Sequence, residues 1–356
     1  ADSGKVATQG GSMQTKDNPW RGQGLPEDVL AGAPMPSIDA DTARRVVDQC
    51  LVAGETPLTP VTGFGPEVWV KDERGRMGMG SFKALGAAYV LAHHALETGA
   101  DDLSCALKGR SYVTASAGNH GLSLAFGAGR FGARAVVFIA ETVPESFAER
   151  LRHHGAEVVR DGPQYEDSME AAAKAADAQG WTLLSDSSWP GYFDLPHRLM
   201  EGYVTLAAEA AEQIPGPPTH ILLQCGVGGM SAACAAYWRA VWGDHPTIIN
   251  VEPEAAPALQ ASVDAGRPVM APGPVSSMGR LDCKDPSLIA LRGLAHDADV
   301  FATITEDEAL DAMPVLDRLG LSTTPSGGAG LAALRQMKLP SDARVLCVLS
   351  EQADVS

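Results

Sequence analysis

The sequence predicts an α/β protein with two lobes, each built on a mostly parallel β-sheet flanked by helices. From residue 67 onward, short apolar runs typical of buried strands alternate with longer runs of helical periodicity. Strands that are apolar on both faces belong to parallel sheets covered by helices on both sides. The alternation is interrupted at residues 185–196 and then starts again, so we expect the chain to cross between lobes there. The length of 356 residues agrees with two domains, or with one domain carrying an inserted lobe.

The first half of the chain predicts five strands and four helices after a proline- and glycine-rich stretch at 17–38, which is expected to wrap a surface. The strands are expected at 68–70, 112–114, 135–139, 157–159 and 181–184, and the helices at 82–97, 119–131, 144–154 and 165–179. Gly155 directly follows the third helix, in the position of a C-cap glycine.

The second half predicts further elements of the same kinds. The helices are expected at 201–213, 230–241, 255–265, 306–319 and 329–336, and the strands at 221–224, 248–252 and 345–349. Residues 1–12 are small and polar and precede Met13, so we interpret them as an expression scar and exclude them from the fold.

Composition limits the possible partners. The chain is 45% hydrophobic and 20% charged, with a formal net charge of −17. This charge argues against nucleic acids and anionic membranes as partners, since both require basic patches. No apolar run is long enough to span a membrane, and no signal peptide is visible. The six cysteines lack CxxC spacing, so we expect no structural zinc site and a reducing, cytoplasmic location.

Lys83 occupies an unusual position for a lysine. It follows the glycine-rich run 77–80 and begins an Ala/Leu-rich helical segment, where a cation opposes the helix dipole. A solvated surface lysine is the simplest interpretation. The alternative is functional, because a desolvated amine on a flexible stem can form a Schiff base with an aldehyde.

A glycine-rich turn follows the apolar strand at 221–224 and opens the next helix. Its residues are Gly226, Val227, Gly228, Gly229 and Met230. Glycines allow the backbone to approach an anion closely, and a helix N-terminus offers free N–H groups, so the turn suits a phosphate. Two alternatives remain, a plain tight turn and a dinucleotide fingerprint with Glu252 as the ribose-binding acid. Ser231 occupies the third glycine position of that fingerprint.

A second turn, at 116–121, also joins a strand to a helix. The Ser116 hydroxyl and the following backbone N–H groups can form a nest for a carboxylate, and Asn119 offers an amide for a ring oxygen. His120 is a possible general base, but no partner carboxylate is near it in sequence, and orientation or capping is the simpler role.

Ser350 follows the last strand, at the sheet edge where open α/β sheets bind ligands. A hydroxyl there can be a neutral partner for a pyridine nitrogen, although capping or simple exposure is also possible. A pyridoxal-phosphate enzyme requires at least one reactive amine and two anion-binding turns, and this sequence contains candidates for all three.

Together these motifs resemble the fold-type II, tryptophan-synthase-β-like family of pyridoxal-phosphate enzymes, from about Asn18 to the C-terminus. Within that family the chain is most similar to the diaminopropionate ammonia-lyases. The similarity rests on the segments 69–73, 81–86, 118–121, 186–192, 202–206 and 226–230. It implies a larger cofactor-binding domain at 13–85 and 195–356, and a smaller, substrate-gating domain at 86–194.

The resemblance also implies roles for particular residues. Lys83 would form the Schiff base and then act as base on the substrate Cα–H, Phe82 would pack beside the cofactor, and Asn119 would bind the ring hydroxyl oxygen. Residues Gly226 to Met230 would hold the phosphate, and Ser350 would face the pyridine nitrogen. The substrate carboxylate would be held by Ser116, Ala117, Gly118 and His120, and Asp186 would lie near the β-substituent.

Two positions depart from patterns in the family. Where diaminopropionate ammonia-lyases typically have an aspartate, thought to serve as a second base for the opposite enantiomer, this chain has Ala117. Either one enantiomer is used or the substrate differs. Some dehydratases and racemases carry a cation-binding glutamate near the turn at 323–330, and none is present here, so we expect no divalent metal.

The resemblance therefore implies an ammonia-lyase that converts a small β-substituted amino acid, similar to 2,3-diaminopropionate, to a 2-oxo acid and ammonia. The alternatives on the same cofactor are a threonine, serine or 3-hydroxyaspartate dehydratase and a β-replacement synthase. A nicotinamide-dependent dehydrogenase and a non-catalytic amino-acid-binding module are alternatives of other classes. A homodimer is the family expectation.

Overall fold

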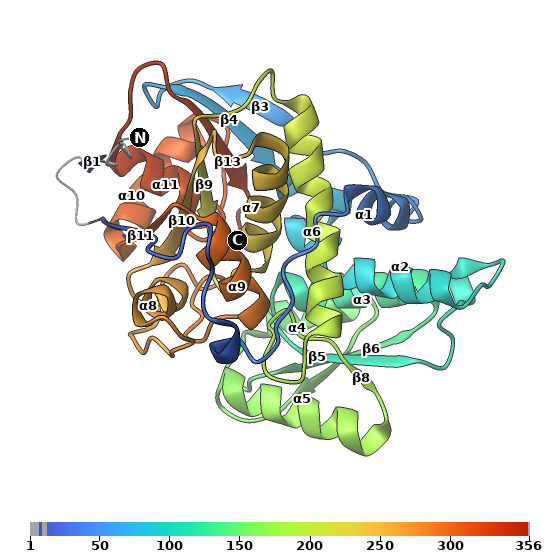
Figure 1. The fold of residues 1–356 in the computed structure, drawn as a ribbon. Coiled ribbons are helices and arrows are strands. Elements are labelled where there is room, and N and C mark those ends of the chain that lie inside the picture. Colours follow the sequence, from blue (N-terminus) through green and yellow to red (C-terminus); the bar gives the residue numbers. More distant parts are fainter. Residues whose placement is uncertain (1–6, 9–12, 355–356) are drawn as a thin grey trace.

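Two main β-sheets organise the computed structural model, which describes residues 7–8 and 13–354. The larger sheet has seven strands in the order β2-β11-β10-β9-β13-β4-β3, and the smaller has four in the order β7-β6-β5-β8. Figure 1 shows the two sheets as separate bodies, with the long helix α6 (Asp194–Gln213) running beside both. The predicted two-lobed α/β architecture with mostly parallel sheets is confirmed.

The five inner strands of the larger sheet run parallel, and both edge strands are antiparallel to their neighbours. The parallel strands are β4 (Glu67–Asp72), β9 (His220–Gln224), β10 (Thr247–Pro253), β11 (Val300–Ile304) and β13 (Arg344–Leu349). The edges are β2 (Gln14–Asp17) and β3 (Leu58–Val61). The inner strands are buried on both faces, as their continuous apolar runs predict.

Helices cover both faces of this sheet. On one face, α6 packs with α1 (Ala40–Val47) and α7 (Gly229–Trp242), and α7 packs with α9 (Leu288–Asp297). The other face is covered by α10 (Glu306–Arg318) and α11 (Ala329–Gln336). The short helix α8 (Ala258–Ala265) follows β10 and contacts α9.

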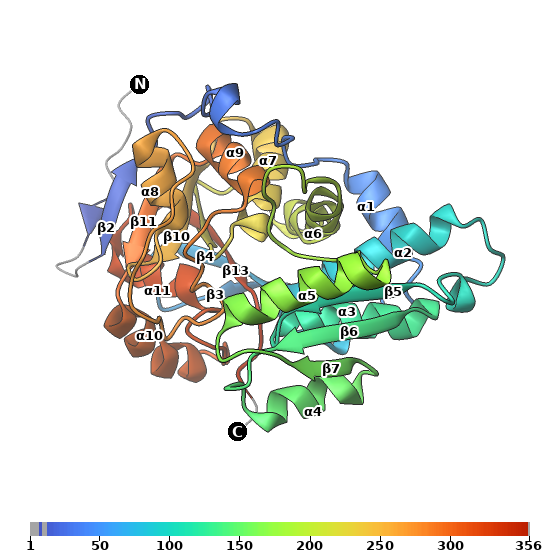
Figure 2. The same cartoon turned by 90° about the horizontal axis from the view of Figure 1, so that it is seen from below.

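The smaller sheet is entirely parallel. Its strands are β5 (Ser111–Ala115), β6 (Arg134–Ile139), β7 (Glu157–Arg160) and β8 (Thr182–Leu183). Helix α5 (Tyr165–Gln179) covers one face of this sheet, and α3 (Asn119–Phe131) and α4 (Glu145–His153) cover the other (Figure 2). Helix α2 (Ala87–Glu97) packs on α3. All four strands fall within 86–194, and the larger sheet is built from 13–85 and 195–356. The domain boundaries themselves stay a prediction.

One predicted segment lies mostly outside the described residues. Of the residues 1–12 that we excluded as an expression scar, only Ala7–Thr8 are described, and they form β1, which pairs antiparallel with β12 (Met337–Lys338).

Two expected helices differ most from their predicted bounds. The segment 82–97 divides into a 3₁₀ turn, Phe82–Leu85, and helix α2, with the break at Gly86. A β-carbon at Gly86 would lie 2.7 Å from the Tyr203 hydroxyl, so the close approach of α6 requires glycine there. Helix α6 begins at Asp194 and not at 201, because Pro196 lies in its first turn, where a missing N–H costs no hydrogen bond.

A buried cluster of charges joins the larger sheet to α6. Lys71 and Arg76 contact the Glu209 carboxylate at 2.6 and 2.7 Å, and Arg76 also contacts Glu73 at 2.7 Å. These four side chains are 0–4% exposed, so each charge depends on the others for compensation.

We expect Glu209→Gln to lower the free energy of unfolding by about 3–5 kcal/mol, because it leaves the buried Lys71 ammonium without its carboxylate partner and Arg76 with Glu73 alone. The matched control is Glu212→Gln on the same helix, whose carboxylate is 57% exposed and pairs with Arg44. That change should cost less than about 1 kcal/mol. Chemical denaturation measures both, and equal effects would contradict the prediction.

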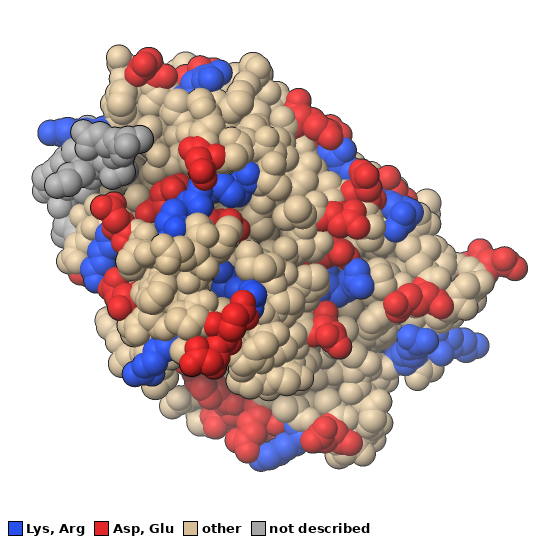
Figure 3. All heavy atoms as spheres, in the orientation of Figure 1, with Lys and Arg blue, Asp and Glu red and all other residues tan. Residues whose placement is uncertain are grey.

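The surface charge is dispersed. Acidic and basic side chains are interspersed over the face in Figure 3, in line with an acidic composition that has no long acidic run. Within residues 7–8 and 13–354, no helix is long and apolar enough to cross a membrane.

Candidate active site

The site forms around Lys83, at the point where the two sheets meet. Its ammonium group makes an ion pair with Asp186, which follows β8 in the smaller sheet. The Lys83 backbone N–H donates to the Ser81 hydroxyl at 3.2 Å, which fixes the start of the 3₁₀ turn. The two predicted catalytic residues therefore lie in direct contact.

The ion pair sets the protonation of both groups. Burial by itself would lower the pKa of Lys83, but the Asp186 carboxylate outweighs burial and raises it above its ordinary value. Burial would likewise raise the pKa of Asp186, and the Lys83 charge instead holds it below its usual range. In the absence of a cofactor, Lys83 is thus held as ammonium and Asp186 as carboxylate.

Aromatic rings flank the lysine. The Lys83 Nζ atom is 5.4 Å from the Phe82 ring centroid and 6.0 Å from that of Tyr203, and the two rings meet edge to face at 5.0 Å. The Phe82 N–H donates to the Ser350 carbonyl at 3.0 Å, so the end of β13 lies beside the lysine turn. Burial raises the pKa of Tyr203 to about 12. Tyr203 belongs to the segment 202–206 that carries the family resemblance, but the sequence alone assigned no role to this tyrosine.

The glycine-rich turn has the shape of an anion cradle. It comprises the five predicted residues Gly226, Val227, Gly228, Gly229 and Met230, which follow β9 and include the first two residues of α7. Gly228 has a φ of +96°, and a β-carbon on it would lie 2.8 Å from the Ala290 methyl. A β-carbon at Gly226 would lie 3.1 Å from the Arg280 carbonyl oxygen. Helix α7 begins at Gly229 with no side-chain cap, which leaves its first N–H groups for an anion.

Gly228→Val is expected to weaken phosphate binding by at least about tenfold, because valine disfavours a positive φ and its side chain collides with α9. Equilibrium titration with pyridoxal phosphate measures this. Gly243 also has a positive φ but has open space around its α-carbon, so Gly243→Val tests backbone strain without the collision. Equal affinities in the two variants would contradict the role of the cradle.

Hydrogen bonds connect the cradle to the segment that carries Asp186. The Ser287 N–H donates to the Val227 carbonyl at 3.2 Å, and the Ser287 hydroxyl lies 2.7 Å from that of Ser188. The cradle and Asp186 are therefore held in a fixed relation through the start of α9.

The turn at 116–120 also lies at the site. The Gly118 N–H donates to the Ser116 hydroxyl at 3.3 Å, and Ala117 is half-buried between them. His120 Nε2 lies 2.9 Å from the Leu184 carbonyl oxygen, and burial lowers the pKa of the ring. The histidine therefore contacts the residue that directly follows β8, two positions before Asp186, where it can orient this part of the chain.

Sequence reasoning missed a buried carboxylate beside Ser350. Glu351 is 4% exposed and accepts hydrogen bonds from Asn119 and Thr324, and Arg280 pairs with it at 3.0 Å. Burial raises the pKa of Glu351 in spite of Arg280. Its only signal in the sequence was its position next to Ser350. Because Asn119 begins α3 and Glu351 follows β13, this contact joins the two sheets.

Comparison with known proteins agrees with this geometry. The family model described as "Pyridoxal-phosphate dependent enzyme" matches residues 50–351. The chain belongs to the pyridoxal-phosphate-dependent enzyme family. It is therefore a pyridoxal-phosphate-dependent lyase, and the predicted family, cofactor and enzyme class are confirmed. The nicotinamide-dependent and non-catalytic alternatives are thereby set aside.

Individual relatives are more specific. The diaminopropionate ammonia-lyase of Salmonella typhimurium is 34% identical over 280 residues, which cover 72% of this chain and 68% of that protein. The crystal structure of the Escherichia coli diaminopropionate ammonia-lyase in complex with an aminoacrylate-PLP azomethine reaction intermediate has a TM-score of 0.83 at 26% identity, covering 98% of this chain and 94% of that one. An L-threonine ammonia-lyase of Geobacter sulfurreducens is 30% identical over 243 residues, 68% of this chain and 58% of that protein.

Proposed function

We propose that this enzyme catalyses α,β-elimination on a small amino acid with a β-amino substituent, such as 2,3-diaminopropionate, to give a 2-oxo acid and ammonia. The single observation that carries the proposal is the contact between Lys83 and Asp186. It places an amine that can accept the Cα proton beside an anion that can attract a cationic β-substituent. The similarity to two diaminopropionate ammonia-lyases supports the same substrate class.

The residues present fit the cofactor. The backbone N–H groups at the start of α7 would hold its phosphate, and the close packing of Gly226 against Arg280 and of Gly228 against α9 fixes where those groups lie. Asn119 would bind the ring hydroxyl and Ser350 would face the pyridine nitrogen, while Phe82 packs beside Lys83. When bound, pyridoxal phosphate supplies a conjugated ring that withdraws electrons from the substrate Cα.

The protein's part is to grip and orient the substrate and to move protons. The nest of Ser116, Ala117, Gly118 and His120 would hold the α-carboxylate, and Lys83 Nζ would take the proton from Cα. Asp186 would attract the β-ammonium group and orient the bond that breaks. Closing the cleft between residues 86–194 and the larger domain would exclude water from these groups.

The identity of residue 117 bears on the stereochemistry. A methyl group cannot carry a proton, so Lys83 is the one base that we propose for the Cα proton. We therefore propose that one enantiomer of the substrate is used. Within the described residues, no cluster of three His, Cys, Asp or Glu side chains could hold a metal ion. A cytoplasmic location and a homodimer are proposals that rest on the family expectation.

A threonine or serine dehydratase is the second candidate, favoured by the similarity to the L-threonine ammonia-lyase. A β-replacement synthase would require an added nucleophile.

The proposal is tested by purifying the protein with its cofactor and assaying 2-oxo acid and ammonia from each enantiomer of 2,3-diaminopropionate, serine and threonine. The diamino acid is expected to give the highest kcat/KM, in one enantiomer only, and to release two ammonia molecules for each oxo acid. Higher kcat/KM for threonine or serine would support the second candidate. Product formation only in the presence of an added nucleophile would overturn both.

A further inference from the structure

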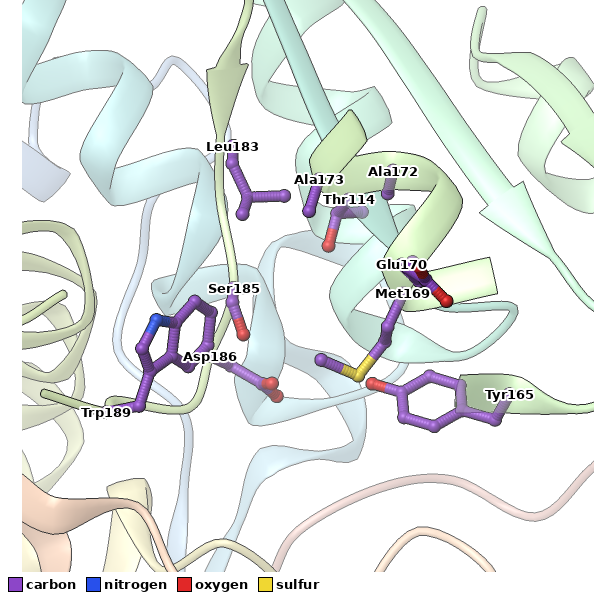
Figure 4. A pocket seen from close by; sticks show the side chains of 11 residues that line it. Thr114, Tyr165, Met169, Glu170, Ala172, Ala173, Leu183, Ser185, Asp186 and Trp189 are labelled. Carbon is purple, nitrogen blue, oxygen red and sulfur yellow. The ribbon is translucent and has the colours of Figure 1, made fainter. Parts of the chain in front are cut away.

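A cavity beside Asp186 is not accounted for by the cofactor or by the substrate carboxylate. Its volume is about 220 Å³, and it lies between α5 and the ends of β5 and β8 (Figure 4). Apart from Asp186, none of the residues that we assign to cofactor or substrate binding lines it. The cavity therefore lies next to the reacting groups and would stay unfilled when the proposed small substrate is bound.

The walls of the cavity are mainly apolar. Met169, Ala172 and Ala173 face it from α5, and Leu183 and Trp189 close the opposite side. Glu170 is at its edge, where the carboxylate is 67% exposed and pairs with Lys174. The polar contribution to the interior comes from hydroxyl groups and from Asp186 at one end.

The size of the cavity indicates what it can hold. An ammonia molecule is about as large as water, which occupies roughly 30 Å³ of the liquid, so it would leave most of the space empty. An engineered apolar cavity of about 150 Å³ in another protein binds benzene and stays dry without it. A cavity of about 220 Å³ can thus accept an apolar group as large as an aromatic ring.

The position of the cavity indicates which part of the substrate enters it. The Asp186 side chain pairs with Lys83 and also lines the cavity, so a group that passes Asp186 extends from the β-substituent. Tyr165 forms the outer wall. Figure 4 shows its hydroxyl pointing inward, toward Met169 and Asp186, while the residue as a whole remains 53% exposed.

We propose that the substrate carries an apolar group of up to aromatic size on its β-nitrogen, and that this cavity binds it. The substrate is then an Nβ-substituted 2,3-diaminopropionate, an inference that rests on the proposed elimination. The Cα proton passes to Lys83 Nζ, and the Cβ–N bond breaks with its electron pair on nitrogen. That nitrogen takes up a proton and leaves as a primary amine, and water converts the three-carbon fragment to 2-oxo acid and ammonium.

The first test compares 2,3-diaminopropionate with its Nβ-benzyl derivative on the holoenzyme. The benzyl compound is expected to have at least about tenfold higher kcat/KM, as for other apolar groups that fill a pocket. Ala173→Leu should lower that value by about 10- to 200-fold and leave the unsubstituted substrate unaffected. Ala178→Leu is the matched control, because Ala178 lies on the same helix and is exposed.

The second test measures binding without turnover. Benzylamine, the expected product, is titrated calorimetrically into the cofactor-free protein, and Ala173→Leu should abolish the binding while Ala178→Leu retains it. Equal kcat/KM for the two substrates, a preference for substrates branched at Cβ, or unchanged benzylamine binding in Ala173→Leu would overturn the inference. If no substrate yields a 2-oxo acid, the proposed function fails, and the titration still decides whether the cavity binds an apolar amine.

Discussion

Lys83→Ala is expected to abolish the visible absorption band of the Schiff base between Lys83 and the cofactor, and to lower kcat by at least about 10³-fold. In the proposed mechanism the variant loses both the amine that would link to the cofactor and the base that would accept the Cα proton, and a positioned base alone contributes about 10²- to 10⁴-fold. The cradle at Gly226 and Gly228 is untouched, so the phosphate should still bind, without the covalent link. Absorption spectra, mass analysis after borohydride reduction and the oxo-acid assay measure these effects.

Two variants control this experiment. Lys174→Ala removes a lysine that is 73% exposed on α5 and should change neither colour nor turnover. Lys83→Arg keeps the positive charge beside Asp186 but cannot form the covalent link, so it should be as inactive as Lys83→Ala. An active Lys83→Arg enzyme, or a borohydride adduct at another lysine, would disprove the assignment.

Local patterns were enough to predict much of the fold. The apolar run at 135–139 became β6 with one added residue, and the helix expected at 119–131 has those bounds in the structure. Both depend on periodicity within a short window, which the chain carries by itself. The glycine-rich turn after β9 was likewise visible, since its φ of +96° at Gly228 requires a residue without a side chain.

Features that depend on distant parts of the chain were not predictable in this way. The break at Gly86 exists because Tyr203 of α6 approaches it. The sequence around residue 86 gives no indication of that contact. Helix α9 and strand β11 were missed altogether, although both are buried in the final packing. The glycine in Leu288–Asp297 weakened the helical pattern there.

The site shows the same division. Lys83, Asn119 and Ser350 could be proposed as site residues because each lies at the start or end of an element that the sequence predicts. The pairing of Lys83 with Asp186 spans 103 positions, and only the resemblance to a family placed Asp186 near the reaction. Glu351 was missed because a carboxylate after a strand is usually solvated, whereas here it is buried by Asn119, Thr324 and Arg280.

Asp186→Asn is expected to retain the cofactor and its colour but to lower kcat/KM for 2,3-diaminopropionate by about 10²-fold or more. A neutral amide cannot attract the β-ammonium group, and hydrogen bonds and ion pairs to charged groups are the stronger ones. The loss should be smaller with serine, whose β-hydroxyl carries no charge. Asp177→Asn, at an exposed position on α5, should leave both substrates unaffected. Equal losses with the two substrates would contradict an electrostatic role.

The same variant should change how the cofactor-free protein takes up pyridoxal phosphate. In the wild type, Asp186 raises the pKa of Lys83, so the reactive free amine appears only at high pH. Without the Asp186 carboxylate, burial is the largest remaining influence on Lys83 and lowers the pKa of its amine. The free amine therefore appears at lower pH. The midpoint of reconstitution rate against pH should therefore move down in Asp186→Asn and stay in place in Asp177→Asn. If it stayed fixed in both, the ion pair would not control the charge of Lys83, and Asp186 could act only on the substrate.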